Sequence, residues 1–190
     1  MNQEPEIYRP SPNEGALRQG EILANVIELR VTIDSLKAGG SPDLSRIIHP
    51  YAMVVSQDCD LAQDFIEREK DQKKVSRLIP SILFCQVIDA ATLKSTVDGR
   101  TWDRVKINKD ERFHFLQTIR PDQDKEHQGL PELGIDFKRY FSIPTEEVYF
   151  RLQSEIKRRC VFFSPYLEHL STRFYYFQSR VALPLDHVSE

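Results

Sequence analysis

The sequence predicts an α+β fold in which a mostly antiparallel sheet carries helical insertions and is followed by a C-terminal amphipathic helix. Short runs rich in β-branched and aromatic residues alternate with polar, turn-forming segments, as the strands of such a sheet do. A charged segment over 61–76 has its few apolar residues at helical spacing. Near the C-terminus, large apolar side chains repeat at intervals of 3 and 4, which is one stripe of a helix.

The chain has 190 residues, enough for one domain with a core of its own. A proline-rich start predicts a flexible N-terminal arm over 1–14, and 15–190 then form a single domain. The formal net charge of −3 gives no sign of a nucleic-acid or membrane partner. No apolar run approaches the ~20 residues of a membrane helix, and the polar N-terminus is unlike a secretory signal. We therefore expect a cytoplasmic protein without membrane contact.

The sequence gives no indication of a cofactor or a metal. The three cysteines are widely spaced and form no C-x-x-C motif, so we expect reduced thiols, mostly buried, rather than disulfides or a zinc site. Glycine is scarce, and the chain contains neither a P-loop nor a G-x-G-x-x-G motif for binding nucleotide phosphates.

The first half of the domain contains three predicted strands, over 21–31, 49–56 and 78–88. The segment 61–76 is predicted to be a surface helix, and 89–100 a short helix or loop insertion that ends at the turn-forming pair Asp98-Gly99. Two alternating segments over 111–119 and 134–143 are predicted to be neighbouring strands, with a polar loop over 120–128 between them. The basic run at 157–159 is interpreted as the solvated edge before a final strand.

The C-terminal helix is the clearest predicted element. Ser164 is its candidate N-cap and Pro165 fits its first position. Its apolar stripe is expected to cover an open face of the sheet and consists of Leu167, Leu170, Phe174, Phe177 and Val181. Because the helix has more aromatic residues than one stripe needs, we predict a contact with a partner protein or a second copy through Phe174, Tyr175, Tyr176 and Phe177.

Two motifs resemble the MazF/PemK family of toxins. Those chains open with R-G-D-I and continue with R-P-x-V-V-x-S, and here 18–22 read R-Q-G-E-I and 49–56 read H-P-Y-A-M-V-V-S. The stretch D-F-K at 136–138 is similar to their later D-x-V-K strand. The resemblance implies an SH3-like β-barrel with a C-terminal helix, usually a homodimer, in a bacterial defence or stress-response system.

A second resemblance, to a group of uncharacterised bacterial proteins, covers about residues 15 to 185 and implies no activity. It rests on S-Q-D-C-D-L at 56–61, on N-K-x-x-R-F-x-x-L at 108–116 and on R-V-x-L-P at 180–184.

The MazF-like resemblance implies metal-independent cleavage of single-stranded RNA. The candidate catalytic residues are His49 as base, Arg18 as electrostatic clamp and Ser56 as phosphate donor. His49 stands where the family has an arginine, and an imidazole cannot reproduce a bidentate, permanently charged guanidinium. The sequence therefore favours a toxin-like module that acts by binding another protein, without intact nuclease chemistry. The endoribonuclease is the alternative.

Two further clusters have alternative interpretations. The carboxylates and thiol of Asp58, Cys59 and Asp60 suit either a metal or nucleophile site, or a helix cap with the cysteine packed inward, and we favour the cap. Lys109, Arg112 and Phe113 mix basic and aromatic side chains, which suits a nucleic-acid-binding module. Apolar and polar residues alternate in this segment, which is typical of a strand with one buried face and one solvent-exposed face. We favour this second interpretation.

Overall fold

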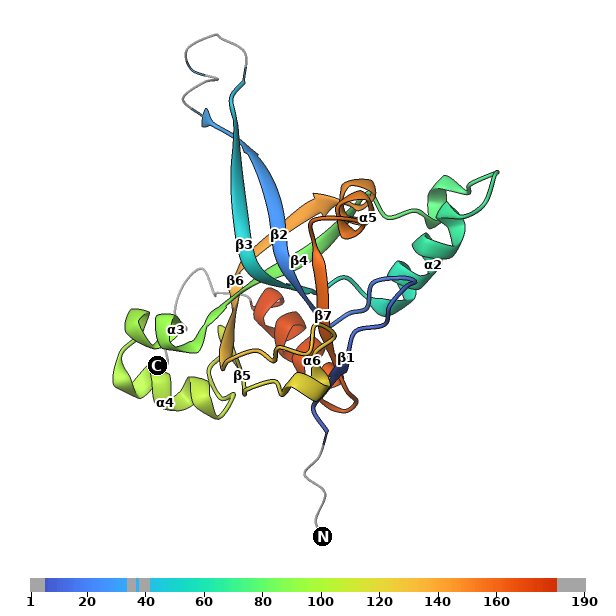
Figure 1. Cartoon of the computed structure of the whole chain (residues 1–190). Helices are drawn as coiled ribbons and strands as arrows, with labels where there is room; N and C mark the ends of the chain where they lie inside the picture. The colour runs from blue at the N-terminus through green and yellow to red at the C-terminus, as the bar shows by residue number, and fades with distance from the viewer. Residues whose placement is uncertain (1–5, 34–36, 38–41, 181–190) are drawn as a thin grey trace, which may run out of the picture.

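The protein is built around one seven-stranded antiparallel sheet in the order β1-β7-β2-β3-β4-β6-β5 (Figure 1). This computed structural model describes residues 6–33, 37 and 42–180. The strands are β1 (Tyr8–Pro10), β2 (Glu21–Val31), β3 (Leu44–Val54), β4 (Ser81–Asp89), β5 (Phe113–Leu116), β6 (Leu133–Pro144) and β7 (Lys157–Phe162).

Five α-helices and two short 3-10 helices connect the strands in the described part of the chain. They are α2 (Asp58–Arg68), η1 (Val75–Arg77), α3 (Ala90–Thr96), α4 (Gly99–Lys106), η2 (Pro121–Gln123), α5 (Thr145–Leu152) and α6 (Tyr166–Gln178). The predicted α+β class with an antiparallel sheet is confirmed. The end strands β1 and β5 do not pair with each other among the described residues, so the sheet is open, and the SH3-like barrel stays a prediction.

The body of the sheet carries one apolar cluster on each face, because successive side chains of a strand point to opposite sides. In β2, Ile22 belongs to one apolar cluster and Leu23 to the other. The first cluster is covered by α6, through Leu170 and Phe177. The second is covered by α2 and α5, whose contributions are Leu61 and Val148.

The apolar stripe of α6 packs on the sheet as predicted. Leu170 and Phe177 are buried, and the ring of Phe174 meets that of Phe137 on β6 edge-on at 5.7 Å. The helix begins at Tyr166 with Pro165 as its N-cap, so Ser164 is not the cap that the sequence suggests. Val181 lies outside the described residues.

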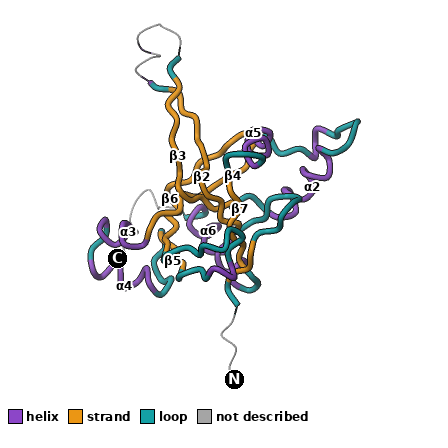
Figure 2. Tube along the Cα trace, in the orientation of Figure 1, coloured by secondary structure: helices purple, strands orange, loops and turns teal. Residues whose placement is uncertain are grey.

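Strands β2 and β3 extend beyond their neighbours as a two-stranded ribbon, which Figure 2 shows projecting from the body. They pair from Ile22 to Val31, whereas β7 pairs with β2 only as far as Ala24. On the other side, β4 pairs with β3 only from Tyr51 to Val54. We call 26–31 and 44–49 the ribbon. Its two faces differ, since Leu29, Val31, Leu44 and Ile48 are exposed on one, and Glu28, Arg30 and His49 lie on the other.

Part of the predicted flexible arm is fixed to the sheet. Tyr8–Pro10 forms β1, which pairs with β7, and Tyr8 is buried against Phe162 with ring centroids 5.1 Å apart. Backbone pairing with β7 and the buried ring of Tyr8 hold this segment on the sheet as an edge strand. The neighbouring strands predicted over 111–119 and 134–143 are confirmed, because β5 pairs with β6 along its length.

The basic run at 157–159 is not a solvated edge. It lies in β7, which is flanked by β1 and β2, and both Arg158 and Arg159 are buried. Arg158 forms a bidentate ion pair with Glu21 at 2.6 and 2.9 Å. Arg159 pairs with Asp124 at 2.8 and 2.7 Å. Each arginine is accommodated in the interior because a carboxylate distant in sequence neutralises it.

Candidate functional site

His49 is held inside the protein rather than presented to solvent. It is 5% exposed, its Nε2 lies 3.0 Å from Oε2 of Glu28, and its ring stacks on Phe141 at 4.1 Å. The strand register explains the pairing with Glu28, because both side chains lie on the same face of the ribbon.

Arg18 and Ser56 both have structural partners. Arg18 donates from Nη2 to Oδ2 of Asp58 at 2.8 Å and from Nε to both carboxylate oxygens at 3.2 Å. The hydroxyl of Ser56 accepts a hydrogen bond from the backbone N–H of Leu83 at 2.8 Å, which ties the end of β3 to β4. These contacts fix the loop that leads into α2.

The three predicted catalytic residues do not line one pocket. Ser56 lines a groove beside α2 and α6, whereas His49 lines a separate cavity at the base of the ribbon. Six residues lie between His49 and Ser56, most of them in β3, which corresponds to about 20 Å along the chain. The two side chains therefore act in different places.

The segment Asp58-Cys59-Asp60 is not the helix cap with an inward-packed cysteine that the sequence favours. Helix α2 has Gln57 as its N-cap and no side-chain cap, since Asp58 instead binds Arg18 and accepts from the backbone N–H of Gln19 at 2.6 Å. Cys59 is exposed rather than packed inward. The described residues contain no group of three or more His, Cys, Asp or Glu placed to hold a metal ion.

The predicted nucleic-acid-binding residues are largely engaged elsewhere. Phe113 is 6% exposed and packs against Leu93 and Val105, so its ring has no open face for a base. Arg112 lies over that ring at 4.6 Å and forms a bidentate ion pair with Asp136 at 2.8 and 2.7 Å. Of the three, only Lys109 is exposed.

A groove of about 860 Å³ lies between the start of α2 and the outer side of α6. Its α2 side carries the 56–60 part of the S-Q-D-C-D-L motif. Its α6 side carries Phe174 and Tyr175, and Leu83 of β4 also lines it. We call this surface the α2–α6 groove. Residues of the most specific sequence motif and two of the predicted partner-binding residues therefore line the same groove.

The four predicted partner-binding residues of α6 separate into two kinds. Phe177 is buried in the core and Phe174 is partly buried against it. Tyr175 and Tyr176 are 73% and 61% exposed, and only Tyr175 lines the groove. The groove residues that the sequence interpretation missed on this helix share a face with Tyr175, at spacings of 4, 3 and 3; they are Ser171, Thr172 and Gln178. The same helical periodicity would have found them.

Comparisons of the chain with protein-family models, with curated proteins and with solved structures give no match. In the described part of the chain, no helix has the length and apolar character needed to cross a membrane.

Proposed function

We propose that this chain is a toxin-like binding module that holds another protein in the α2–α6 groove, within a bacterial defence or stress-response system. The observation that carries the proposal is the meeting of the S-Q-D-C-D motif with Phe174 and Tyr175 in one groove. The setting in defence or stress response rests on the resemblance to MazF/PemK toxins.

The groove has the composition of a site for a protein segment. Leu83 and Phe174 contribute apolar side chains to its lining, and the exposed ring of Tyr175 adds an aromatic one. Tyrosine is enriched at protein interfaces because it offers apolar area and a hydrogen-bonding hydroxyl with few rotatable bonds. The lining also contains the exposed carboxylate of Asp60, whereas Asp58 is paired with Arg18. We infer a partner segment with one large apolar side chain next to a basic one.

We favour binding over RNA cleavage because the residues proposed for cleavage are separated and engaged. Cleavage needs a base and phosphate-stabilising groups around one reacting atom. Arg18 is paired with Asp58, and Ser56 holds Leu83, away from the cavity that His49 lines.

The groove offers a direct experiment through Cys59. This thiol is exposed in the groove, whereas Cys85 and Cys160 are fully buried. A maleimide–benzophenone reagent attached to Cys59 should, on illumination in a lysate of the native host, cross-link one discrete protein that mass spectrometry identifies. The matched control carries the reagent on exposed Lys94→Cys of α3 in a Cys59→Ser background.

Two tyrosine variants refine the test. Tyr175→Ser should abolish the adduct, and Tyr176→Ser, an exposed neighbour outside the groove lining, should leave it in place. Absence of an adduct, or the same adducts from Cys59 and from position 94, contradicts the proposal. An adduct with a second copy of the chain also contradicts it and assigns the groove to a homo-oligomer.

A further inference from the structure

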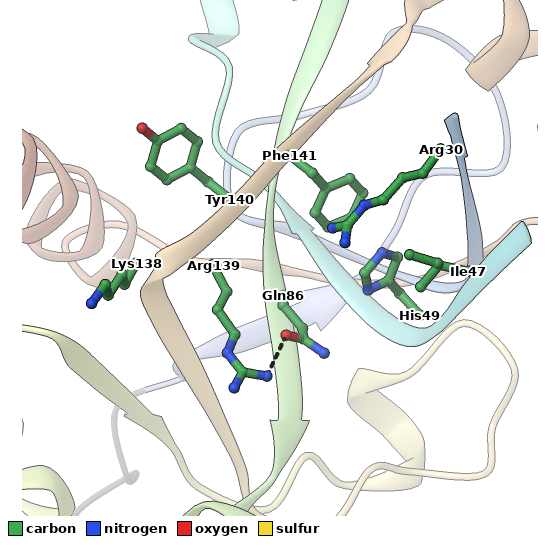
Figure 3. A pocket seen from close by; sticks show the side chains of 8 residues that line it. All are labelled: Arg30, Ile47, His49, Gln86, Lys138, Arg139, Tyr140 and Phe141. Atoms are coloured by element: carbon green, nitrogen blue, oxygen red, sulfur yellow. Dashed lines mark hydrogen bonds between the residues drawn. The ribbon is translucent and has the colours of Figure 1, made fainter. Parts of the chain in front are cut away.

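A second cavity, of about 430 Å³, lies at the base of the ribbon (Figure 3). Residues of β2, β3, β4 and β6 line it, so side chains far apart in sequence meet there. The side chains that matter are Arg30 of β2, Ile47 and His49 of β3, Gln86 of β4, and Arg139 and Phe141 of β6. Its lining residues are separate from those of the α2–α6 groove.

The orientation of the side chains divides this lining into two parts. Figure 3 shows Arg139 and Phe141 on the side of β6 that carries Gln86 and His49, while Lys138 and Tyr140 point to the other side of the strand. Arg30 comes from the ribbon and lies beside Phe141. Two guanidinium groups from different strands therefore face one cavity.

Arg30 is oriented by a carboxylate that it shares with His49. It donates from Nε and Nη2 to the two carboxylate oxygens of Glu28, at 2.7 and 3.0 Å. Burial opposes ionisation of Glu28, but these bonds and the one from His49 outweigh burial and lower the pKa of the carboxyl. Because the ionised carboxylate can only accept, Nε2 of His49 carries a proton. The carboxylate of Glu28 thus orients the side chains of both Arg30 and His49 at the cavity.

The charge of Arg139 is weakly compensated. Its nearest carboxylate oxygen belongs to Asp136 at 3.5 Å. Asp136 already accepts hydrogen bonds from Nε and Nη2 of Arg112, at 2.8 and 2.7 Å. The Arg139 side chain is 62% exposed, and its Nη1 donates to Oε1 of Gln86 at 3.3 Å. That bond leaves the amide N–H groups of Gln86 as further donors on the side toward His49 (Figure 3).

We propose that this cavity binds the phosphate group of a nucleotide. Planar guanidinium groups match the oxygens of phosphate in bidentate geometry, and two of them face the cavity together with the Gln86 amide. The half-buried side chain of Ile47 supplies an apolar side for the sugar or base of the nucleotide, whereas the ring of Phe141 is 8% exposed and stacked on His49. The volume falls within the range of small-ligand pockets. The inference is independent of the α2–α6 groove.

Calorimetric titration of the full chain with three probes tests the proposal: inorganic phosphate, adenosine 5′-monophosphate and a single-stranded uridine octanucleotide. We expect the mononucleotide to bind more tightly than inorganic phosphate. A further gain for the octanucleotide would show that the site takes a phosphate within a strand, and equal binding would assign it to the free nucleotide. Either result supports the nucleotide site.

The variants use a matched arginine on the opposite face of the same ribbon. Arg30→Gln and Arg139→Gln should each weaken mononucleotide binding about tenfold, as expected for the loss of a charge-assisted hydrogen-bonded contact. Arg46→Gln should leave it within about twofold, because Arg46 faces away from the cavity and pairs with Glu155. Arg30 and Arg46 have the same side-chain exposure, 57%. The comparison therefore separates the effect of lying at the cavity from the effect of losing an exposed positive charge.

Three outcomes overturn the inference. One is no heat of binding from any probe, confirmed by unchanged NMR signals of the His49 ring. Another is a mononucleotide that binds no more tightly than inorganic phosphate. The third is an equal loss of affinity in Arg46→Gln, which would mean non-specific attraction to the ribbon. None of these results changes the cross-linking of Cys59, so failure here is distinguishable from failure of the proposed function.

Discussion

Arg159 and Asp124 form a bidentate ion pair inside the protein, although 35 residues separate them in the chain. The Asp124 side chain is fully buried and also accepts hydrogen bonds from the backbone N–H groups of Gln128 and Gly129 at 3.1 and 2.9 Å. The pair therefore joins β7 to the loop after η2 and satisfies both charges in the interior.

Replacing Asp124 with asparagine should destabilise the protein strongly. The variant leaves the Arg159 guanidinium buried without its counter-charge, which typically costs about 3–5 kcal/mol in the free energy of unfolding. Chemical denaturation at neutral pH measures the change. The control is Asp122→Asn, two residues away in an exposed pair with Arg120, which should change the stability by less than about 0.5 kcal/mol. Equal effects of the two substitutions would contradict the role of the buried pair.

The stability should fall as the pH is lowered, because of His114. Burial, with smaller contributions from Arg173 and His169, lowers the pKa of this imidazole from 6.5 to about 3. Between these values the unfolded chain binds a proton that the folded chain does not, so acid favours unfolding. His114 alone should contribute a slope of about 1.4 kcal/mol per pH unit in this window.

Urea denaturation between about pH 6 and pH 4 tests this expectation with two variants. His114→Phe removes the titrating group, and with it a buried Nδ1 that has no hydrogen-bond partner in the described structure, so the slope should flatten. His127→Asn replaces an exposed histidine at positive φ, where asparagine is tolerated, and should retain the wild-type slope. A slope unaffected by His114→Phe would show that other groups dominate the acid sensitivity.

Only one of the three thiols should react in the native protein. Cys59 is exposed, and burial raises the pKa of both Cys85 and Cys160, which disfavours the reactive thiolate. Titration with a chromogenic disulfide should therefore release one equivalent under native conditions and three in denaturant. Cys59→Ser should remove the native reaction, and residual reactivity would mean that a buried cysteine is accessible.

Ser56→Ala should lower the free energy of unfolding by about 1 kcal/mol, because the Leu83 N–H loses its acceptor. Ser171→Ala is the matched control on the groove, since its hydroxyl only donates to the Leu167 carbonyl within α6. It should change stability by less than about 0.5 kcal/mol. An unchanged stability of Ser56→Ala would remove the anchoring role assigned to this hydroxyl.

The elements that the sequence predicts well are those whose local pattern agrees with their packing. The apolar residues of α6 recur at helical spacing, and the strand segments over 21–31 and 134–143 have runs of apolar residues that are buried in the sheet. Helix α5 was missed, because it follows β6 directly and lacks a side-chain cap. The edge strand β1 was missed because its pairing depends on β7, which lies 150 residues later.

The candidate site could be predicted only in part. The exposure of Tyr175 and Tyr176 follows from their position off the α6 stripe. The burial of Arg158 and Arg159 does not follow from local sequence, because Glu21 and Asp124 are brought to them by the sheet and by a loop. His49 and Ser56 are close in sequence but lie about 20 Å apart along an extended chain, so nearness in sequence gave no guide to a shared pocket.

The projecting ribbon should be the most easily opened part of the sheet. Among the described residues, 26–31 and 44–49 pair only with each other, so both outer edges leave backbone groups to water. Amide hydrogens there should exchange with deuterium far sooner than those of Leu23 or Ala52 at the base, where two neighbouring strands protect the backbone. A nucleotide bound by Arg30 and Arg139 would link the ribbon to β6. Slower deuterium exchange of the amide hydrogens across 26–31 in the presence of the nucleotide would show that link.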